Sequence, residues 1–182
     1  MPQICVPLAN GFEEIEAISI IDICRRGDLE VIVAGVEGKI ALGAHDIPVV
    51  TDCLIQEVVA DQLDMMILPG GWVGTQTLAN NTQVQSLLKQ LQQTQKQIGA
   101  ICAAPYALEA AGVLGSHFTC YPSIAEKIEN LGYDADQAVV TDNNVMTSQG
   151  VGTAICFALA VVKHFQGESV YQELKTAILA KC

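Results

Sequence analysis

The chain has 182 residues, of which 51% are hydrophobic and 16% charged. This composition excludes a disordered chain and suits one compact domain with a well-buried core. Twenty acidic against nine basic residues give a formal net charge of −11, so stable nucleic-acid and membrane partners are not expected. No stretch approaches the roughly 20 apolar residues of a membrane span, and residues 1–14 lack the basic start of a signal peptide. We therefore expect a cytoplasmic protein.

Short apolar runs alternate with helical patterns from end to end, and glycine or proline stands at many of the junctions. In chain order we expect a strand at 4–8, a helix at 14–26, strands at 29–35, 39–42, 47–51 and 65–71, a helix at 83–96, a strand at 97–102, a helix from Pro105, a helix at 123–131, strands near 138–140 and 145–148, and helices at 153–166 and 168–180.

This alternation predicts an α/β fold. Strands separated by helices of ten or more residues require right-handed crossovers, and these give a mostly parallel sheet with helices on both faces. Residues 39–42 and 47–51 are expected to form a small antiparallel pair instead. We find no linker, repeat or low-complexity segment, so residues 1–182 are expected to form a single domain. In such sheets ligands bind beyond the carboxyl ends of the strands.

The chain contains seven cysteines, and no two are spaced as CxxC. This spacing excludes a zinc ribbon and a thioredoxin-type redox motif. An odd number in a chain of this length predicts mostly free thiols. We expect Cys182 to be exposed and merely oxidisable. Four others are expected to be small buried hydrophobes: Cys5, Cys24, Cys53 and Cys156.

Cys102 lies in the segment GAICAAP (99–105), where an apolar strand ends, two alanines follow, and Pro105 stands at the first helical turn. This pattern predicts a strand–turn–helix elbow whose tip residue projects over the sheet in a strained backbone. A thiol at a helix N-terminus is expected to have a lowered pKa. The alternative is a small residue that fills a strand–helix junction, and we favour a reactive Cys102.

Two further segments follow strand ends. In LPGG (68–71) the paired glycines allow close approach to a ligand, and the N–H groups of Gly71 and Ala103 are the natural donors of an oxyanion hole. In ANGFEEIEA (9–17) acidic residues crowd a helix start, where charge complements the helix dipole. Glu16 lies in a helix that is otherwise apolar nearly all round. A carboxyl drawn toward the sheet would have a raised pKa and could donate a hydrogen bond to a thiolate. Both interpretations of Glu16 remain open from composition.

The segments LANGFEEIEA, AGVEG, LPGGWVG, GAICAAP and TSQGVGTA together resemble the ThiJ/PfpI superfamily, in its Parkinson disease protein 7 and YajL-like branch. The resemblance runs from residue 3 to about 175. It implies a flavodoxin-like three-layer sandwich and a homodimer. It further implies a nucleophilic Cys102, a protonated Glu16 hydrogen-bonded to the sulfur, and oxyanion amides at Gly71 and Ala103. Gly70 and Tyr121 are the expected pocket residues.

Tyr121 departs from the family pattern, since many members have a histidine at this position in a THP-like motif. A tyrosine with a pKa near ~10 cannot act as a general base at neutral pH. His117 lies four residues back, roughly 13 Å away if the segment is a strand, which is too far for substitution. His45 and His164 are interpreted as ordinary surface residues. A Cys–His protease or amidotransferase is therefore poorly supported.

Two functions are compatible with these residues. In the first, Cys102 attacks methylglyoxal, glyoxal or their adducts, the oxyanion rests on two amides, and Glu16 shuttles a proton. The resemblance implies both a glyoxalase and a deglycase activity of this kind, with no metal or organic cofactor. In the second, Cys102 oxidises without turnover, in a redox-responsive chaperone or sensor. The expected partners are small aldehydes or glycated adducts and a second copy of the chain.

Overall fold

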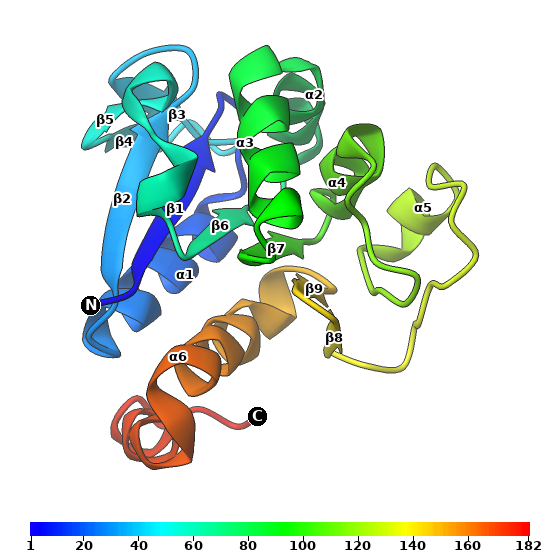
Figure 1. The fold of residues 1–182 in the computed structure, drawn as a ribbon. Coiled ribbons are helices and arrows are strands. Elements are labelled where there is room, and N and C mark those ends of the chain that lie inside the picture. The colour runs from blue at the N-terminus through cyan, green and yellow to red at the C-terminus, as the bar shows by residue number, and fades with distance from the viewer.

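The computed structural model describes all of residues 1–182, as a single sheet covered by helices and a separate two-stranded hairpin (Figure 1). The strands are β1 (Gln3–Leu8), β2 (Glu30–Gly35), β3 (Ile40–Leu42), β4 (Pro48–Val50), β5 (Cys53–Leu54), β6 (Met65–Leu68), β7 (Gln97–Ile101), β8 (Val139–Asp142) and β9 (Val145–Ser148). The helices are α1 (Glu14–Arg26), α2 (Trp72–Asn80), α3 (Thr82–Gln93), α4 (Pro105–Ala111), α5 (Pro122–Ala125) and α6 (Ala154–Ala177), with short 3-10 turns η1 (Ile55–Glu57), η2 (Ala60–Gln62) and η3 (Val151–Thr153).

The main sheet has seven strands in the order β5-β2-β1-β6-β7-β9-β8. All neighbours pair in parallel except β8 and β9, which form an antiparallel edge. Strands β3 and β4 pair antiparallel in a separate hairpin, as predicted. The order places the carboxyl ends of β1, β6 and β7 side by side at the centre of the sheet.

Two hydrophobic cores lie on opposite faces of this sheet, which makes three layers. Alternate residues of β1 supply both, because successive strand side chains point to opposite faces. Ile4, Val6 and Leu8 pack with α1 and α6, whereas Cys5 packs with α3 and α4. Figure 1 shows these two helix pairs on opposite sides of the strands. The flavodoxin-like α/β architecture expected from the sequence is confirmed.

Three parts of the chain differ from the prediction. Helix α2 was not expected, because its first residues follow directly on the paired glycines and its apolar stripe is weak. The helix expected at 123–131 is only the single turn α5, and the chain then turns where Asn130 donates to the carbonyl of Gly115 at 2.8 Å. The segment around His117 is not a strand, and only a single bridge joins Phe118 to Tyr133.

The two C-terminal helices were expected on either side of Gly167, and the structure has a break there inside α6. Gly167 adopts φ of 85°, in the left-handed region that favours glycine. None of the helices combines the length and the apolar character needed to cross a membrane.

The cysteines correct two expectations. Cys156 and Cys182 form a disulfide, so Cys156 is not a buried hydrophobe and Cys182 is not a free terminal thiol. The sequence pattern could not show this pairing, since only the fold of α6 brings two residues so far apart in the chain together. Cys5 and Cys24 are buried free thiols, as expected, whereas Cys53 is only half-buried.

Candidate active site

The site lies where the carboxyl ends of β1, β6 and β7 meet. Cys102 directly follows β7, and the Gly70–Gly71 turn follows β6. Glu16 lies in the first turn of α1, which follows β1. The topology therefore brings together three segments that are far apart in the sequence, at the edge where parallel α/β sheets bind ligands.

Cys102 occupies the predicted elbow. Its φ of 62° lies in the left-handed region, which costs free energy for any residue other than glycine. Two backbone hydrogen bonds hold this conformation: the Cys102 N–H donates to the carbonyl of Ser148 at 3.0 Å, and the Tyr121 N–H donates to the carbonyl of Cys102 at 2.9 Å. Pro105 then begins α4. The strained backbone is thus fixed by its neighbours and presents the thiol above the sheet.

Glu16 is completely buried, although it carries an ionisable group. The N–H of Gly70 donates to Oε2 of Glu16 at 2.8 Å, while Oε1 has no conventional hydrogen-bond partner. Burial raises the pKa of the Glu16 carboxyl to about 7, against a smaller lowering by the Gly70 N–H and by Cys102. Because Oε2 acts as an acceptor, Oε1 is the oxygen that is free to carry the proton. The carboxyl is therefore protonated in a large fraction of molecules at neutral pH.

The expectation of a lowered pKa for the Cys102 thiol is wrong. Burial and the negative charge of an ionised Glu16 raise this pKa to about 12, while the N–H groups of Gly71 and Ala103 lower it. The sequence showed neither the burial of Cys102 nor the carboxylate beside it. Between the pKa of Glu16 and that of Cys102 the pair therefore holds one negative charge, and the lower pKa of Glu16 places most of that charge on its carboxylate. The N–H groups of Gly71 and Ala103 act in the opposite direction, because they stabilise the thiolate.

The Gly70–Gly71 turn is required by close packing. A Cβ atom on Gly70 would lie 2.6 Å from Oε2 of Glu16 and 2.7 Å from Cβ of Cys102. Gly71 has φ of 87°, and a Cβ there would collide with the carbonyl of Gly11. Only glycine lets the backbone amides come this close to the sulfur.

A cavity of about 500 Å³ opens above Cys102. Its lining residues come from five segments of the chain: Glu13, Gly71, Trp72, Cys102, Ala103, Tyr121, Ser123, Ile124, Lys127 and Val151. A second cavity of about 370 Å³ is lined by Cys102, Tyr121 and Pro122 and by residues 149–153. Cys102 therefore lines two cavities.

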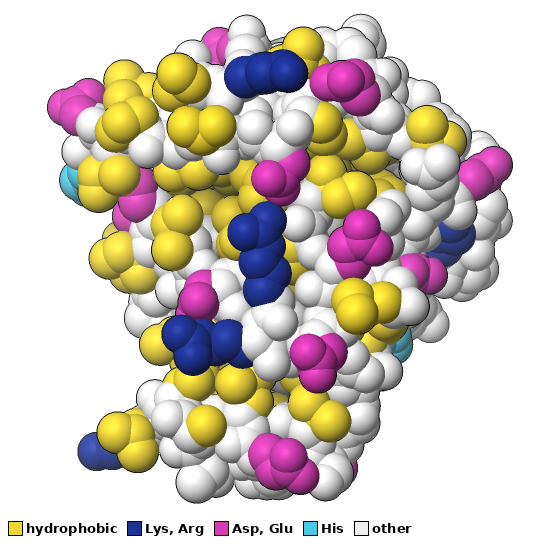
Figure 2. Space-filling view, turned by 90° about the vertical axis from the view of Figure 1, so that its left-hand side faces the viewer, with side chains coloured by type: hydrophobic (Ala, Val, Ile, Leu, Met, Phe, Trp, Pro, Cys, Tyr) yellow, Lys and Arg dark blue, Asp and Glu magenta, His cyan; other side chains and the backbone are white.

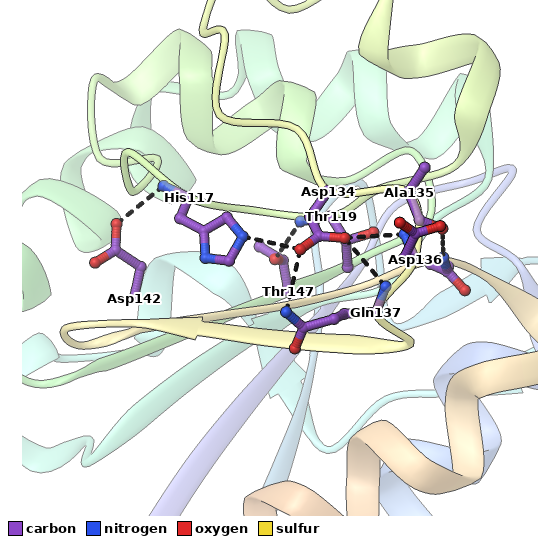
Figure 3. A network of polar contacts seen from close by, with 9 residues as sticks. His117, Thr119, Asp134, Ala135, Asp136, Gln137, Asp142 and Thr147 are labelled. Carbon is purple, nitrogen blue, oxygen red and sulfur yellow. Dashed lines mark hydrogen bonds and ion pairs between the residues drawn. The ribbon is translucent and has the colours of Figure 1, made fainter.

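Tyr121 lines both cavities and is half-exposed, in agreement with its expected place in the pocket. His117 does not take over the role of the absent histidine (Figure 3). Its Nε2 lies 3.0 Å from Oδ2 of Asp134, and its N–H donates to Asp142 at 3.0 Å. These contacts tie His117 to the end of β8 and to the loop that contains Asp134 rather than to Cys102, so the site holds no histidine.

One group of side chains consists of residue types that bind metal ions. Glu13, Glu14 and His45 place their ligand atoms within 4.8 Å of one another. The group is already an ion pair, since Nδ1 of His45 lies 2.9 Å from Oε2 of Glu14. The Glu14 carboxylate raises the pKa of His45, whose hydrogen bonds in turn lower the pKa of buried Glu14. His45 is exposed, as expected, but it fastens the β3–β4 loop to α1.

The sequence patterns did not single out Trp72, Ser123, Lys127 or Val151, although all four line the cavity. Trp72 directly follows the paired glycines in the LPGGWVG segment, and this position could have indicated a place at the site. Lys127 follows the short α5, where a longer helix was expected, and nothing in its local pattern marks it.

This arrangement defines a class: an α/β protein with a cysteine at a nucleophile elbow, set against a buried carboxyl. A sequence profile described as the DJ-1/PfpI family matches residues 2–164. The chain therefore belongs to the DJ-1/PfpI family, which confirms the resemblance to the ThiJ/PfpI superfamily.

Individual proteins agree with this assignment. "Glutathione-independent glyoxalase DJR-1.2" of Caenorhabditis elegans is 37% identical over 171 residues, 93% of this chain and 91% of that protein. "Protein DJ-1 homolog B" of Arabidopsis thaliana is 35% identical over 98% of this chain, which spans only 41% of that longer protein. The crystal structure of Drosophila melanogaster DJ-1beta superposes with a TM-score of 0.96 at 35% identity, covering 100% of this chain and 99% of that one.

Proposed function

We propose that this protein is a cofactor-free glyoxalase that converts methylglyoxal, glyoxal and related α-oxoaldehydes into 2-hydroxy acids. The observation that carries the proposal is the buried Glu16 carboxyl, with its raised pKa and free Oε1, beside the Cys102 thiol. A relative of similar length is named as a glutathione-independent glyoxalase, which supports the same chemistry here.

Cys102 is the proposed nucleophile. Its thiolate adds to the aldehyde carbon, a C–S bond forms, and the carbonyl oxygen becomes an oxyanion. The N–H groups of Gly71 and Ala103, which already face the sulfur, are placed to stabilise that oxyanion. The Glu16 proton passes to the oxyanion and gives a neutral hemithioacetal. The resulting Glu16 carboxylate is then ready to act as a base.

The second half of the reaction is a proton transfer between adjacent carbons. The Glu16 carboxylate removes the proton of the former aldehyde carbon and returns it to the neighbouring carbonyl carbon. The hydroxyl proton of the hemithioacetal moves to the neighbouring oxygen, and the result is a thioester with a hydroxyl group on the next carbon. The first carbon is oxidised and the second is reduced, so no external oxidant or cofactor is required. Water then hydrolyses the thioester, the C–S bond breaks, and the products are a 2-hydroxy acid and the regenerated thiolate with protonated Glu16.

The test is incubation of the purified protein with methylglyoxal while D- and L-lactate are measured, with Cys102→Ser as the inactive control. We expect catalytic production of lactate by the unaltered protein. A stoichiometric adduct without lactate would instead favour the redox-responsive function. That alternative is supported by the accessibility of Cys102 from two cavities, whereas Cys5, Cys24 and Cys120 are buried.

A deglycase activity would use the same residues. The hemithioacetals and aminocarbinols that methylglyoxal forms with other molecules release an aldehyde carbon for attack by Cys102. Release of lactate from a preformed cysteine–methylglyoxal adduct, faster than the adduct dissociates without protein, would support this activity. A rate equal to spontaneous dissociation would restrict the protein to free aldehydes.

We also propose that the protein forms a homodimer, because several large apolar side chains are exposed on one face. Figure 2 shows hydrophobic side chains gathered on the side of the molecule that carries β2, β4 and β5. The hairpin exposes Ile40 and Val50, while Ile15 and Ile18 are exposed on α1. The His45–Glu14 ion pair holds these two elements together. A group of exposed apolar side chains of this kind is typical of a protein–protein interface.

A cytoplasmic location remains a proposal that the cysteines support. Five of the seven are free thiols, a usage typical of reducing compartments. In such a compartment the Cys156–Cys182 disulfide would be open to reduction at the exposed C-terminus.

A further inference from the structure

The cavity above Cys102 is larger than the small aldehydes of the proposed reaction. Methylglyoxal has five heavy atoms and needs about 150 Å³ if each takes about the 30 Å³ share of a water molecule. The cavity measures about 500 Å³, so most of it is left for the remainder of a longer substrate. Trp72, Ile124 and Lys127 are among the residues that line the cavity.

Lys127 is the only cationic side chain that lines this cavity. Its Nζ lies 5.4 Å from the centroid of the Trp72 ring, a cation–π contact that limits the motion of a long side chain. The Trp72 ring is itself held edge-on by Tyr106, with ring centroids 5.2 Å apart. The Lys127 N–H donates to the carbonyl of Ile124 at 2.8 Å, which fixes the backbone.

The Lys127 ammonium has no acidic partner and no hydrogen-bond acceptor in the chain, in contrast to Lys163, which pairs with Glu168 at 2.7 Å. A cation that lines a nucleophile's cavity and forms no ion pair is suited to an anionic group on the substrate. Glu109 and Glu129 line a neighbouring cavity with Lys127, but neither forms an ion pair with it. In a chain with a net charge of −11, where anions are otherwise repelled, Lys127 is the group of this cavity that attracts them.

We infer that Lys127 is a specificity-determining residue, and that it selects α-oxoaldehydes whose far end carries a carboxylate. This inference rests on the proposed function, because it names the substrate class of the same site. A monoanion fits better than a phosphate dianion, since the cavity offers one ammonium and the Ser123 hydroxyl and also contains the Glu13 carboxylate. The carboxylate binds Lys127 while the aldehyde carbon lies at Cys102.

The test compares two five-carbon α-oxoaldehydes, 4,5-dioxopentanoate with a terminal carboxylate and the uncharged 2-oxopentanal. We expect Lys127→Gln to lower the ratio of their kcat/KM values, charged over uncharged, by about fivefold, the effect of one partly exposed ion pair. Lys127→Arg should keep the ratio high. Lys89→Gln is the matched control, because it removes the same charge from an exposed position on α3 that does not line the cavity.

Salt gives a readout that a purely structural role of Lys127 would not affect. Added sodium chloride should lower the ratio for the unaltered protein and leave it constant for Lys127→Gln. A ratio that is equal in the unaltered protein, Lys127→Gln and Lys89→Gln would overturn the inference, while turnover of 2-oxopentanal would leave the glyoxalase proposal standing.

If neither aldehyde is turned over, the glyoxalase proposal fails and binding still tests Lys127. Each aldehyde should protect Cys102 from iodoacetamide by forming the hemithioacetal, and the two half-protecting concentrations give the ratio. The carboxylate should protect at the lower concentration, and Lys127→Gln should remove that advantage. Equal protection by both aldehydes in the unaltered protein would overturn the inference.

Discussion

Glu16 is the residue on which the proposed chemistry depends. It is buried without a cation nearby, and a carboxyl in this position keeps its proton to a higher pH than usual. The same burial that makes Glu16 costly for the fold makes it able to donate and accept a proton near neutral pH. A carboxylate that only complemented the helix dipole would be favoured in its charged form, whereas burial favours the protonated form of Glu16.

Glu16→Gln should keep the fold and a reactive Cys102 but lose aldehyde turnover by at least ~10²-fold, the usual contribution of a general acid–base group. The amide can still donate a hydrogen bond to the sulfur, but it cannot exchange a proton with substrate. Glu16→Leu should in addition lower the pKa of Cys102, measured from thiolate absorbance against pH, because the carboxylate charge that raises this pKa is gone. Full activity in Glu16→Gln with unchanged titration in Glu16→Leu would reduce Glu16 to a structural residue.

The pH dependence of kcat/KM in the unaltered protein should reflect the titration of Glu16 and Cys102. Below pH 7 both Glu16 and Cys102 are protonated, and the first proton leaves as the pH rises through about 7. We therefore expect kcat/KM to rise with an apparent pKa near 7 and then to level off. A profile that is flat between pH 6 and 8 in the unaltered protein would contradict this assignment.

Tyr121 holds the position where many relatives have a histidine, and its backbone N–H already supports the elbow through the Cys102 carbonyl. Tyr121→Phe preserves that bond and the ring, so most of the activity should remain. The measurement is lactate formation by Tyr121→Phe, compared with that of the unaltered protein and of Cys102→Ser. A loss as deep as that of Cys102→Ser would make the hydroxyl part of the catalytic machinery.

At the scale of elements, the site depends on tight connections after neighbouring strands. The turn after β6 needs glycine twice, and the turn after β7 holds a cysteine in a left-handed backbone. The C-terminal half of α6 is attached differently. Beyond the break at Gly167, few of its side chains are buried, and the Cys156–Cys182 disulfide closes the segment back onto the first half.

Removal of this disulfide should loosen the end of α6 with no effect on Cys102. A bond that closes a loop of 26 residues contributes up to about 3.5 kcal/mol to the free energy of unfolding. We expect Cys182→Ser to lower the midpoint of thermal unfolding and to expose residues 168–182 to limited proteolysis. Identical proteolysis patterns for the two proteins, with and without reductant, would show that packing alone holds this segment.

At the scale of the whole molecule, the proposed homodimer uses the apolar side chains exposed on α1 and on the β3–β4 hairpin. Ile18→Asp places a charge among these side chains, where a partner would have to bury it at high cost. We expect the unaltered protein to have twice the monomer mass in light scattering and Ile18→Asp to have the monomer mass. Lys89→Gln, on the opposite helix layer, is the control. A monomeric unaltered protein at micromolar concentration would refute the homodimer.

The free energy of unfolding should also depend on pH through the buried Glu16 carboxyl. The folded state keeps the Glu16 proton up to a pH of about 7, whereas the unfolded chain releases it near 4.5, so stability falls as the pH rises between these values. Glu16→Gln lacks this contribution. The free energy of unfolding of the variant, relative to that of the unaltered protein, should therefore rise by about 2–3 kcal/mol from pH 4 to pH 8. Urea unfolding at the two pH values measures the difference, and a constant difference would mean that Glu16 has an ordinary pKa.

Local patterns in the sequence determined a large part of this protein. Periodicity predicted α1, the main strands and the β3–β4 pair, since side-chain spacing follows directly from helix and strand geometry. Small residues and a proline around Cys102 predicted the elbow, because only a tight turn requires them. These features depend on residues that are close together in the chain.

Only the tertiary structure decided the properties that depend on distant residues. The pKa of Cys102 follows from burial and from Glu16, which is 86 residues away in sequence, so its direction could not be inferred from the helix start alone. The Cys156–Cys182 bond follows from the path of α6, and Lys127 entered the cavity because the expected helix 123–131 is replaced by one turn. Burial, charge proximity and cavity shape are sums over neighbours in space, and a linear pattern does not contain them.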